Sequence, residues 1–152
     1  MGSGVEMVIS ALEWYDPRDA RRLSWRSSVS GSERMTVDGY RDLVVYQKAM
    51  RLARECYLLA GEFKRESRYI GADLRHSSLI IPAKIARVHN MPECRDRERS
   101  FDRAFGKLGR LEGLLEIGEH IGEASPARLA ECRLLIDEVR RLLRTLEGKW
   151  RD

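Results

Sequence analysis

Positively charged side chains are concentrated in one part of the sequence, residues 64–99. This segment holds nine Lys and Arg residues against five Asp and Glu residues, and it therefore carries the whole formal net charge of +4. Because phosphate groups are bound by cations spaced along one surface, the segment predicts contact with a nucleic acid. The candidate nucleic-acid-binding residues are Arg65, Arg68, Arg75, Lys84, Arg87, Arg95, Arg97 and Arg99.

The same charges have a second interpretation. In residues 95–103, RDRERSFDR, acidic residues alternate with arginines, so that opposite charges lie three positions apart. On a helix this spacing produces a solvated face of local ion pairs, which needs no ligand. The sequence leaves both interpretations open.

Residues that could support catalysis are poorly placed for it. The His-Ser-Ser run at residues 76–78 would point in three directions around a helix, so it cannot form a nucleophile and its base. Glu112, Glu116 and Glu119 share one helix face, but a di-metal site in a bundle needs inward-facing ExxH pairs. The sequence therefore predicts a protein without enzymatic activity or a small-molecule substrate.

The cysteines and histidines do not indicate a metal site or a cofactor. Cys56, Cys94 and Cys132 are widely spaced and include no CxxC pair, and the three histidines lack ligand spacing with cysteines or carboxylates. We interpret the cysteines as reduced, small core residues of a cytoplasmic protein. No stretch approaches the roughly 20 apolar residues that span a bilayer, and no signal peptide is expected, so we expect no contact with a membrane.

Apolar residues recur every three or four positions from residue 38 onward, which predicts four amphipathic helices. The first runs from Asp38 to Phe63, the second from Ser67 to about Val88, the third to about Ile121, and the last begins after the Ser-Pro start signal at residues 125–126. Short connections between four such helices predict an all-α, antiparallel, up-and-down four-helix bundle.

Pro82 lies inside the second predicted helix. Proline removes one backbone donor and crowds the preceding turn, which ends or bends a helix. The apolar pattern resumes at Ile85 and Val88, so we expect a kink and not an end. The kinked helix would place Ile81 and Ile85 in the core and Lys84 on the surface.

The first part of the chain differs from the bundle. Residues 1–36 include the Ser- and Gly-rich run SWRSSVSGSERM and lack a sustained apolar period. We expect a weakly ordered extension at 1–36 and one bundle domain at 37–152. Met35 could then be the natural first residue.

Two of the predicted helices carry motifs of a known family. Residues 40–63 resemble the first helix of the bacterial four-helix bundle proteins called 23S rRNA intervening-sequence proteins, which is approximately F-x-D-L-x-V-W-Q-K-A. The direct matches are Asp42, Leu43, Val45, Gln47, Lys48 and Ala49. Residues 73–88 resemble the second helix of the family, approximately QLRRAAVSIPANIAEG. The matches there are Leu74, Arg75, Ile81, Pro82, Ala83, Ile85 and Ala86.

The third helix adds a shorter match. Residues 106–118 resemble the family stretch G-S-L-x-E-L-E through Gly106, Leu108, Leu111 and Glu112, so that the likeness extends over about residues 38–149. The resemblance implies a closed bundle that assembles as a ring, typically a homopentamer, without known catalytic activity. Members are often encoded in insertions of large-subunit ribosomal RNA genes. Related accessory variability proteins of diversity-generating retroelements bind a reverse transcriptase and its template RNA.

The chain departs from the family pattern in the second helix. Lys84, Arg87 and Val88 stand where the pattern has Asn, Glu and Gly. Neutral and acidic positions have thus become cationic, which places any role of the Asn and Glu in doubt.

The first predicted helix also carries apolar residues outside its core stripe. Tyr46, Met50 and Tyr57 could form a subunit interface, because aromatic residues and Met are enriched in interfaces. They could equally widen the core stripe of the bundle. We therefore expect an RNA-binding scaffold that self-associates; the alternative is a protein-interaction accessory subunit, for example of a retroelement reverse transcriptase.

Overall fold

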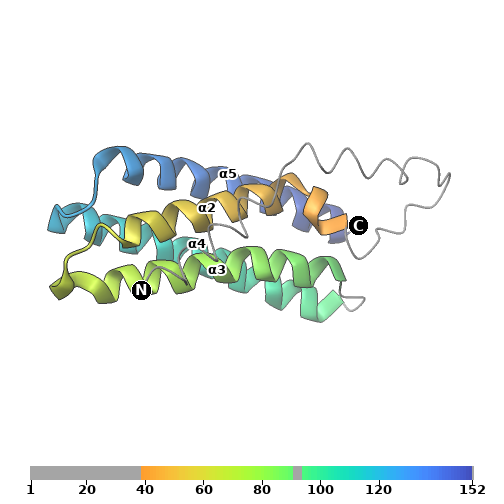
Figure 1. Cartoon of the computed structure of the whole chain (residues 1–152). Coiled ribbons are helices and arrows are strands. Elements are labelled where there is room, and N and C mark those ends of the chain that lie inside the picture. The colour runs from red at the N-terminus through yellow and green to blue at the C-terminus, as the bar shows by residue number, and fades with distance from the viewer. Residues whose placement is uncertain (1–38, 91–93, 152) are drawn as a thin grey trace.

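The computed structural model describes residues 39–90 and 94–151, and within these ranges it contains helices and no strand. Four long helices lie side by side along the molecule (Figure 1). They are α2 (Val44–Ala60), α3 (Arg68–Asn90), α4 (Cys94–Ile121) and α5 (Pro126–Arg151), and two short 3-10 helices, η2 (Gly39–Asp42) and η3 (Arg65–Ser67), precede α2 and α3. The all-α prediction is confirmed. The predicted extension at 1–36, with Met35, lies outside the described residues.

The predicted apolar stripes are the buried faces of the helices. On α2 the buried residues include Val45, Ala49, Leu52, Cys56 and Leu59, and on α3 they include Ile70, Leu74, Ser77, Ile81, Ile85 and Val88. Every one of these positions follows the spacing of three and four that places side chains on one side of a helix. For these two helices, the spacing of the apolar residues in the sequence therefore predicts which residues are buried.

Two residues that follow the apolar spacing of the sequence lie at the edge of the core instead of inside it. Phe105 and Leu142 are half-buried against the core. On α5 the residue next to Leu142, Leu143, is the one that is completely buried. Because one residue turns a helix by about 100°, neighbouring apolar residues compete for the inward position. Packing against the other helices decides which of them is buried.

Ion pairs show how α5 lies along α2. Lys48 Nζ lies 2.9 Å from Glu138 Oε2, Arg51 Nη2 lies 2.7 Å from Glu131 Oε1, and Arg128 Nη1 lies 3.2 Å from Glu55 Oε2. Residue numbers rise along α2 while they fall along α5, which is the order that oppositely directed neighbours produce. Each exposed pair contributes little to stability, but together they neutralise the seam between the two helices.

Pro82 is buried inside α3, and the helix continues through it to Asn90. Its ring nitrogen cannot donate to the carbonyl of Ser78. The prediction that the proline does not end the helix is confirmed, and the kink itself stays a prediction. None of the helices in the described ranges is long and apolar enough to cross a membrane.

At one end of the bundle, the connection between α2 and α3 is hydrogen-bonded to the connection between α4 and α5. The backbone N–H of Lys64 donates to Glu123 Oε2 at 2.9 Å, and the backbone N–H of Ser125 donates to Glu62 Oε2 at 3.0 Å. Ser125 also accepts a hydrogen bond from the backbone N–H of Arg128 and so caps α5, as its sequence signal predicted. At the other end, α2 begins at Val44, later than predicted from Asp38, because η2 precedes it.

Glycine contributes to close packing at two positions. A Cβ on Gly71 would lie 2.7 Å from the backbone oxygen of Ala60, so α3 approaches the end of α2 closely. A Cβ on Gly118 would lie 2.8 Å from the Phe63 ring. Gly113, in contrast, has no described atom within 4 Å of the position that its Cβ would take, so a close helix does not explain it.

We expect Gly71→Ala to lower the free energy of unfolding by about 1–3 kcal/mol, because the added methyl group would collide with a backbone atom. Gly113→Ala is the matched control. It should raise stability by up to about 1 kcal/mol, since alanine favours a helix and meets no neighbour here. Urea unfolding followed by circular dichroism measures both changes, and equal effects of the two variants would contradict the close approach.

Candidate nucleic-acid interface

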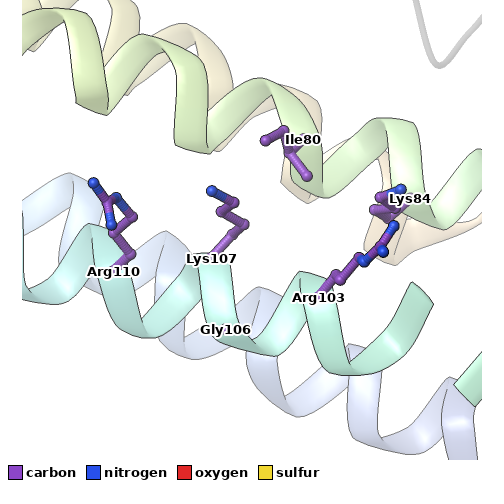
Figure 2. A pocket seen from close by; sticks show the side chains of 6 residues that line it. All are labelled: Ile80, Lys84, Arg103, Gly106, Lys107 and Arg110. Atoms are coloured by element: carbon purple, nitrogen blue, oxygen red, sulfur yellow. The ribbon is translucent and has the colours of Figure 1, made fainter. Parts of the chain in front are cut away.

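A groove with a volume of about 580 Å³ lies between α3 and α4. Its lining residues are Ile80 and Lys84 from α3 and Arg103, Gly106, Lys107 and Arg110 from α4 (Figure 2). We call this site the α3–α4 groove. Four of its six lining residues are cations, so the groove offers positive charge from two helices to one bound molecule.

The spacing along each helix explains why these side chains meet. Arg103, Lys107 and Arg110 lie four and three positions apart, so they form one stripe along α4. Lys84 lies one turn after Ile80 on α3, on the side that faces this stripe. Figure 2 shows the Arg103 side chain pointing toward Lys84, and Lys107 and Arg110 pointing toward α3.

One end of the groove is neutralised by an acidic residue. Arg110 donates from Nε to Asp73 Oδ1 at 2.9 Å and from Nη2 to Asp73 Oδ2 at 2.5 Å, and Ser77 Oγ donates to Asp73 Oδ1 at 2.9 Å. The hydrogen bond from Arg110 is the main reason that the pKa of Asp73 lies below its usual value, and the Ser77 hydroxyl lowers it further. This fork holds the Arg110 side chain in one orientation along α3.

The rest of the groove has no ion pair, although Lys107 is close enough to Asp73 to lower the pKa of that carboxyl. Lys84, Arg103 and Lys107 form no ion pair with a carboxylate of the described residues. Partial burial lowers the pKa of Lys84, and the positive charges of Arg103 and Arg87 lower it further. The part of this decrease that comes from Arg103 and Arg87 shows that the two arginines add positive potential at Lys84, which favours an anion there.

The model of the family described as 23S rRNA-intervening sequence protein matches residues 41–145, which include α2, α3, α4 and most of α5. This chain belongs to that family. The match confirms the resemblance drawn from the motifs of the first three helices. None of the curated proteins with which the chain was compared matches it.

Of the three departures from the family pattern, the two that change the charge lie at or beside the groove, whereas Val88 is buried in the core. Lys84, which replaces the Asn of the pattern, lines the groove, and Arg87, which replaces the Glu, is close enough to lower the pKa of Lys84. Both substitutions add positive charge. In this member of the 23S rRNA-intervening sequence family the groove is therefore more cationic than the pattern alone predicts.

The other predicted nucleic-acid-binding residues lie away from the groove. Arg65 and Arg68 lie where α3 begins, whereas Arg95, Arg97 and Arg99 lie in the first two turns of α4, at the opposite end of the bundle (Figure 1). Arg99 is the nearest of these to the groove, because it precedes Arg103 by one turn on the same helix. The structure thus brings together Lys84 and Arg87 and separates the remaining six.

Two arginines of the predicted set stack on aromatic rings. Arg75 lies over the Tyr57 ring of α2, with its guanidinium carbon 4.4 Å from the ring centre, and Arg97 lies 5.5 Å from the Trp150 ring centre. Arg75 is nine residues from Lys84, so it lies on the opposite side of α3, beside α2. These contacts stabilise the bundle and direct both arginines away from the groove.

Sequence reasoning missed Arg103, Lys107 and Arg110. A charge count over residues 100–152 shows no excess, because these cations are balanced by acids on other faces. Their spacing of four and three was the signal that could have found them. The alternative interpretation of residues 95–103 is supported by a 3.9 Å approach of Arg99 Nη1 to Asp96 Oδ1.

The predicted interface residues Tyr46, Met50 and Tyr57 are all half-buried within the chain. Tyr46 packs against the core and meets the Tyr40 ring edge to face, with ring centres 5.1 Å apart. Tyr57 lies beneath Arg75. The contacts of Tyr46 favour the interpretation that it widens the core of the bundle, whereas the role of Met50 and Tyr57 in a subunit interface stays a prediction.

The residues weighed for catalysis have structural contacts. Ser78 is buried and donates to the backbone oxygen of Arg75 at 3.1 Å. Glu112 pairs with Arg140, with 2.7 Å between Oε2 and Nη2, and Glu119 pairs with Arg133, so both acids belong to the seam between α4 and α5. The described residues include no group of three His, Cys, Asp or Glu side chains that could hold a metal ion.

We expect Asp73→Asn to lower the free energy of unfolding by about 0.5 kcal/mol near neutral pH, because Arg110 is largely exposed and water screens the pair. The folded-state pKa of Asp73 is lowered, so its stabilising effect is complete above the unfolded-state value of about 3.9 and is lost as pH falls through the lower folded-state value. The difference between wild type and variant should thus be constant above about pH 5 and shrink toward zero in stronger acid. Chemical unfolding at a series of pH values measures it, and a difference that grows in acid would contradict the assignment.

Proposed function

We propose that the chain is a non-enzymatic RNA-binding protein and that the α3–α4 groove contacts the phosphates of the RNA. The observation that carries the proposal is the meeting of Lys84, Arg103 and Lys107 around one groove in which Lys84 and Arg103 form no ion pair with a described carboxylate. Such a group of cations attracts a polyanion and gains free energy by releasing the counterions of its phosphates. The description of the family names the intervening sequence of 23S rRNA, which supports RNA as the polyanion to test first.

The other cations would have a secondary role in this proposal. Arg87 lies beside Lys84, and Arg99 continues the stripe of α4 toward the end of the bundle, so both would extend the phosphate-binding path. Arg65 in η3 and Arg68 at the start of α3 lie too far from the groove to contact the same short stretch of RNA. They would add to the general attraction of the molecule for RNA.

We propose further that the antiparallel bundle assembles as a homopentameric ring. Large apolar side chains exposed on the surface of the described chain support self-association: Val44, Tyr69, Leu79, Ile117, Ile121 and Leu134. Five copies of a +4 chain carry a formal charge of about +20, and repeated weak contacts with one RNA then add together. A ring would therefore convert a modest charge on each chain into useful affinity.

Replacing Lys84 and Arg103 by Glu in one double variant should weaken RNA binding at least about tenfold near physiological salt. The matched control is Arg54→Glu with Arg144→Glu, which changes the net charge equally at exposed positions on α2 and α5 without a described ion pair. Affinity for a structured ribosomal RNA fragment is measured at several salt concentrations. The slope of log affinity against log salt should become shallower by about 0.7 for each single-strand phosphate that the variant no longer binds.

Equal losses of affinity in the groove variant and the control variant would show that net charge binds RNA and that the groove has no special role. An assembled protein that does not bind RNA even at low salt would contradict the RNA proposal. The remaining function would then be that of a protein-interaction accessory subunit, and a reverse transcriptase is one partner to test. Circular dichroism of both variants checks that the helices are retained.

The ring predicts a mass in solution. Five chains of 17.6 kDa give about 88 kDa, which light scattering coupled to size-exclusion chromatography measures directly. The mass should persist at high salt, because apolar contacts are not screened by ions. A particle of 17.6 kDa at micromolar concentration would contradict the ring.

A further inference from the structure

Lys84 differs in its surroundings from the lysines that lie outside the α3–α4 groove. The sequence contains five lysines: Lys48, Lys64, Lys84, Lys107 and Lys149. Lys48 forms an ion pair with Glu138, whereas Lys64 and Lys149 are exposed on the surface. Lys84 is half-buried in the groove, and the charged groups that lower its pKa, Arg103 and Arg87, are positive.

These surroundings make the Lys84 amine a better nucleophile than an ordinary surface amine. Burial and the two arginines lower its pKa, so that a larger fraction of it is uncharged at neutral pH. Only the uncharged amine has the lone pair that attacks a carbonyl carbon. Asp73 is the acidic residue at this groove. Its carboxylate is hydrogen-bonded to Arg110 and forms no ion pair with Lys84.

The same groove has the groups that bind a phosphate. Figure 2 shows Arg103 pointing toward Lys84, with Lys107 one turn farther along α4. A guanidinium group matches the geometry of phosphate oxygens, and an ammonium group adds a further donor. The nucleophile and the phosphate-binding groups therefore lie side by side on facing helices.

We propose that the α3–α4 groove is an acylation site, in which Arg103 and Lys107 bind the phosphate of an acyl phosphate and Lys84 Nζ accepts its acyl group. The Nζ lone pair forms a bond to the carbonyl carbon while the bond from that carbon to the phosphate oxygen breaks. The bond's electron pair leaves with the phosphate, and the proton lost from nitrogen passes to the released phosphate or to water. The product is an uncharged amide on Lys84.

Acylation would also act on the binding surface. It removes one positive charge from the groove and increases the length of the Lys84 side chain. If the proposed RNA binding is correct, the modified protein binds RNA more weakly, so this consequence alone depends on that proposal. The acylation itself is measured as a mass change and needs no RNA.

The test is incubation of the full chain with acetyl phosphate, followed by peptide mass spectrometry that gives the initial rate of acetylation at each of the five lysines. We expect Lys84 to react on the order of fivefold faster than Lys48, Lys64 and Lys149, because binding of the donor places its carbonyl beside the amine. Inorganic phosphate should slow the reaction at Lys84 by competing for Arg103, and it should leave the other three rates unchanged. Rates for Lys84 no higher than for the exposed lysines would overturn the proposal.

A second donor separates binding of the phosphate from reactivity of the amine. The N-hydroxysuccinimide ester of acetic acid carries no phosphate, so its reaction reports amine reactivity alone. Arg103→Gln should reduce acetylation of Lys84 by acetyl phosphate more than acetylation by this ester. Arg54→Gln, on the exposed face of α2, is the matched control and should change neither rate. Equal reductions with both donors would overturn the role of Arg103 in binding the phosphate.

The RNA measurement is kept apart from the acylation measurement. Lys84→Gln imitates the uncharged product and Lys84→Arg keeps the charge, so the former should weaken RNA binding more than the latter. Selective acetylation without this difference in affinity would uphold the acylation site and contradict the groove as the RNA site. Failure of acetylation with the difference intact would overturn the acylation site and uphold RNA binding.

Discussion

Each helix of the bundle must turn one apolar stripe toward the common core, and the rest of the structure depends on this constraint. Leu52, Leu74, Leu108 and Ile136, one from each helix, are completely removed from solvent. Burying a side chain of this size contributes about 1.5–3 kcal/mol, so a helix cannot rotate about its axis without a large loss of stability. Once the rotation of each helix is set, the direction of every polar side chain on it is set as well. The α3–α4 groove is thus a consequence of core packing.

The seams between the helices differ in whether their charged side chains form ion pairs. Along α2 and α5 and along α4 and α5, arginines and a lysine pair with glutamates, so those seams are neutral. Along α3 and α4 the Asp73–Arg110 pair neutralises one end, and beyond it the cations of the groove repel one another. This repulsion opposes folding and is offset by the core. Natural proteins accept such local costs mainly where a surface binds a ligand.

The chain shares the bundle with its family and differs from the family pattern in the charge of one surface. Lys84 and Arg87 replace an Asn and a Glu of the pattern, and both are part of the group of cations beside α4. The core positions of the same motif, Ile81, Pro82 and Ile85, are unchanged and buried. Val88, which replaces a Gly of the pattern, is buried in the core, so of the three departures Lys84 and Arg87 are the two that change the charge of the surface.

The sequence by itself determined the four helices, their buried stripes and the family, because a period of 3.6 residues and short motifs are local properties of a chain. It also showed that α3 continues through Pro82, since the apolar pattern resumes beyond the proline. Only the tertiary structure decided which charges meet. Arg103 lies 19 residues after Lys84, and a charge count along the chain separates them, whereas helix packing places them across one groove. The same packing places Arg75 on the far side of α3, because nine residues of helix amount to two and a half turns.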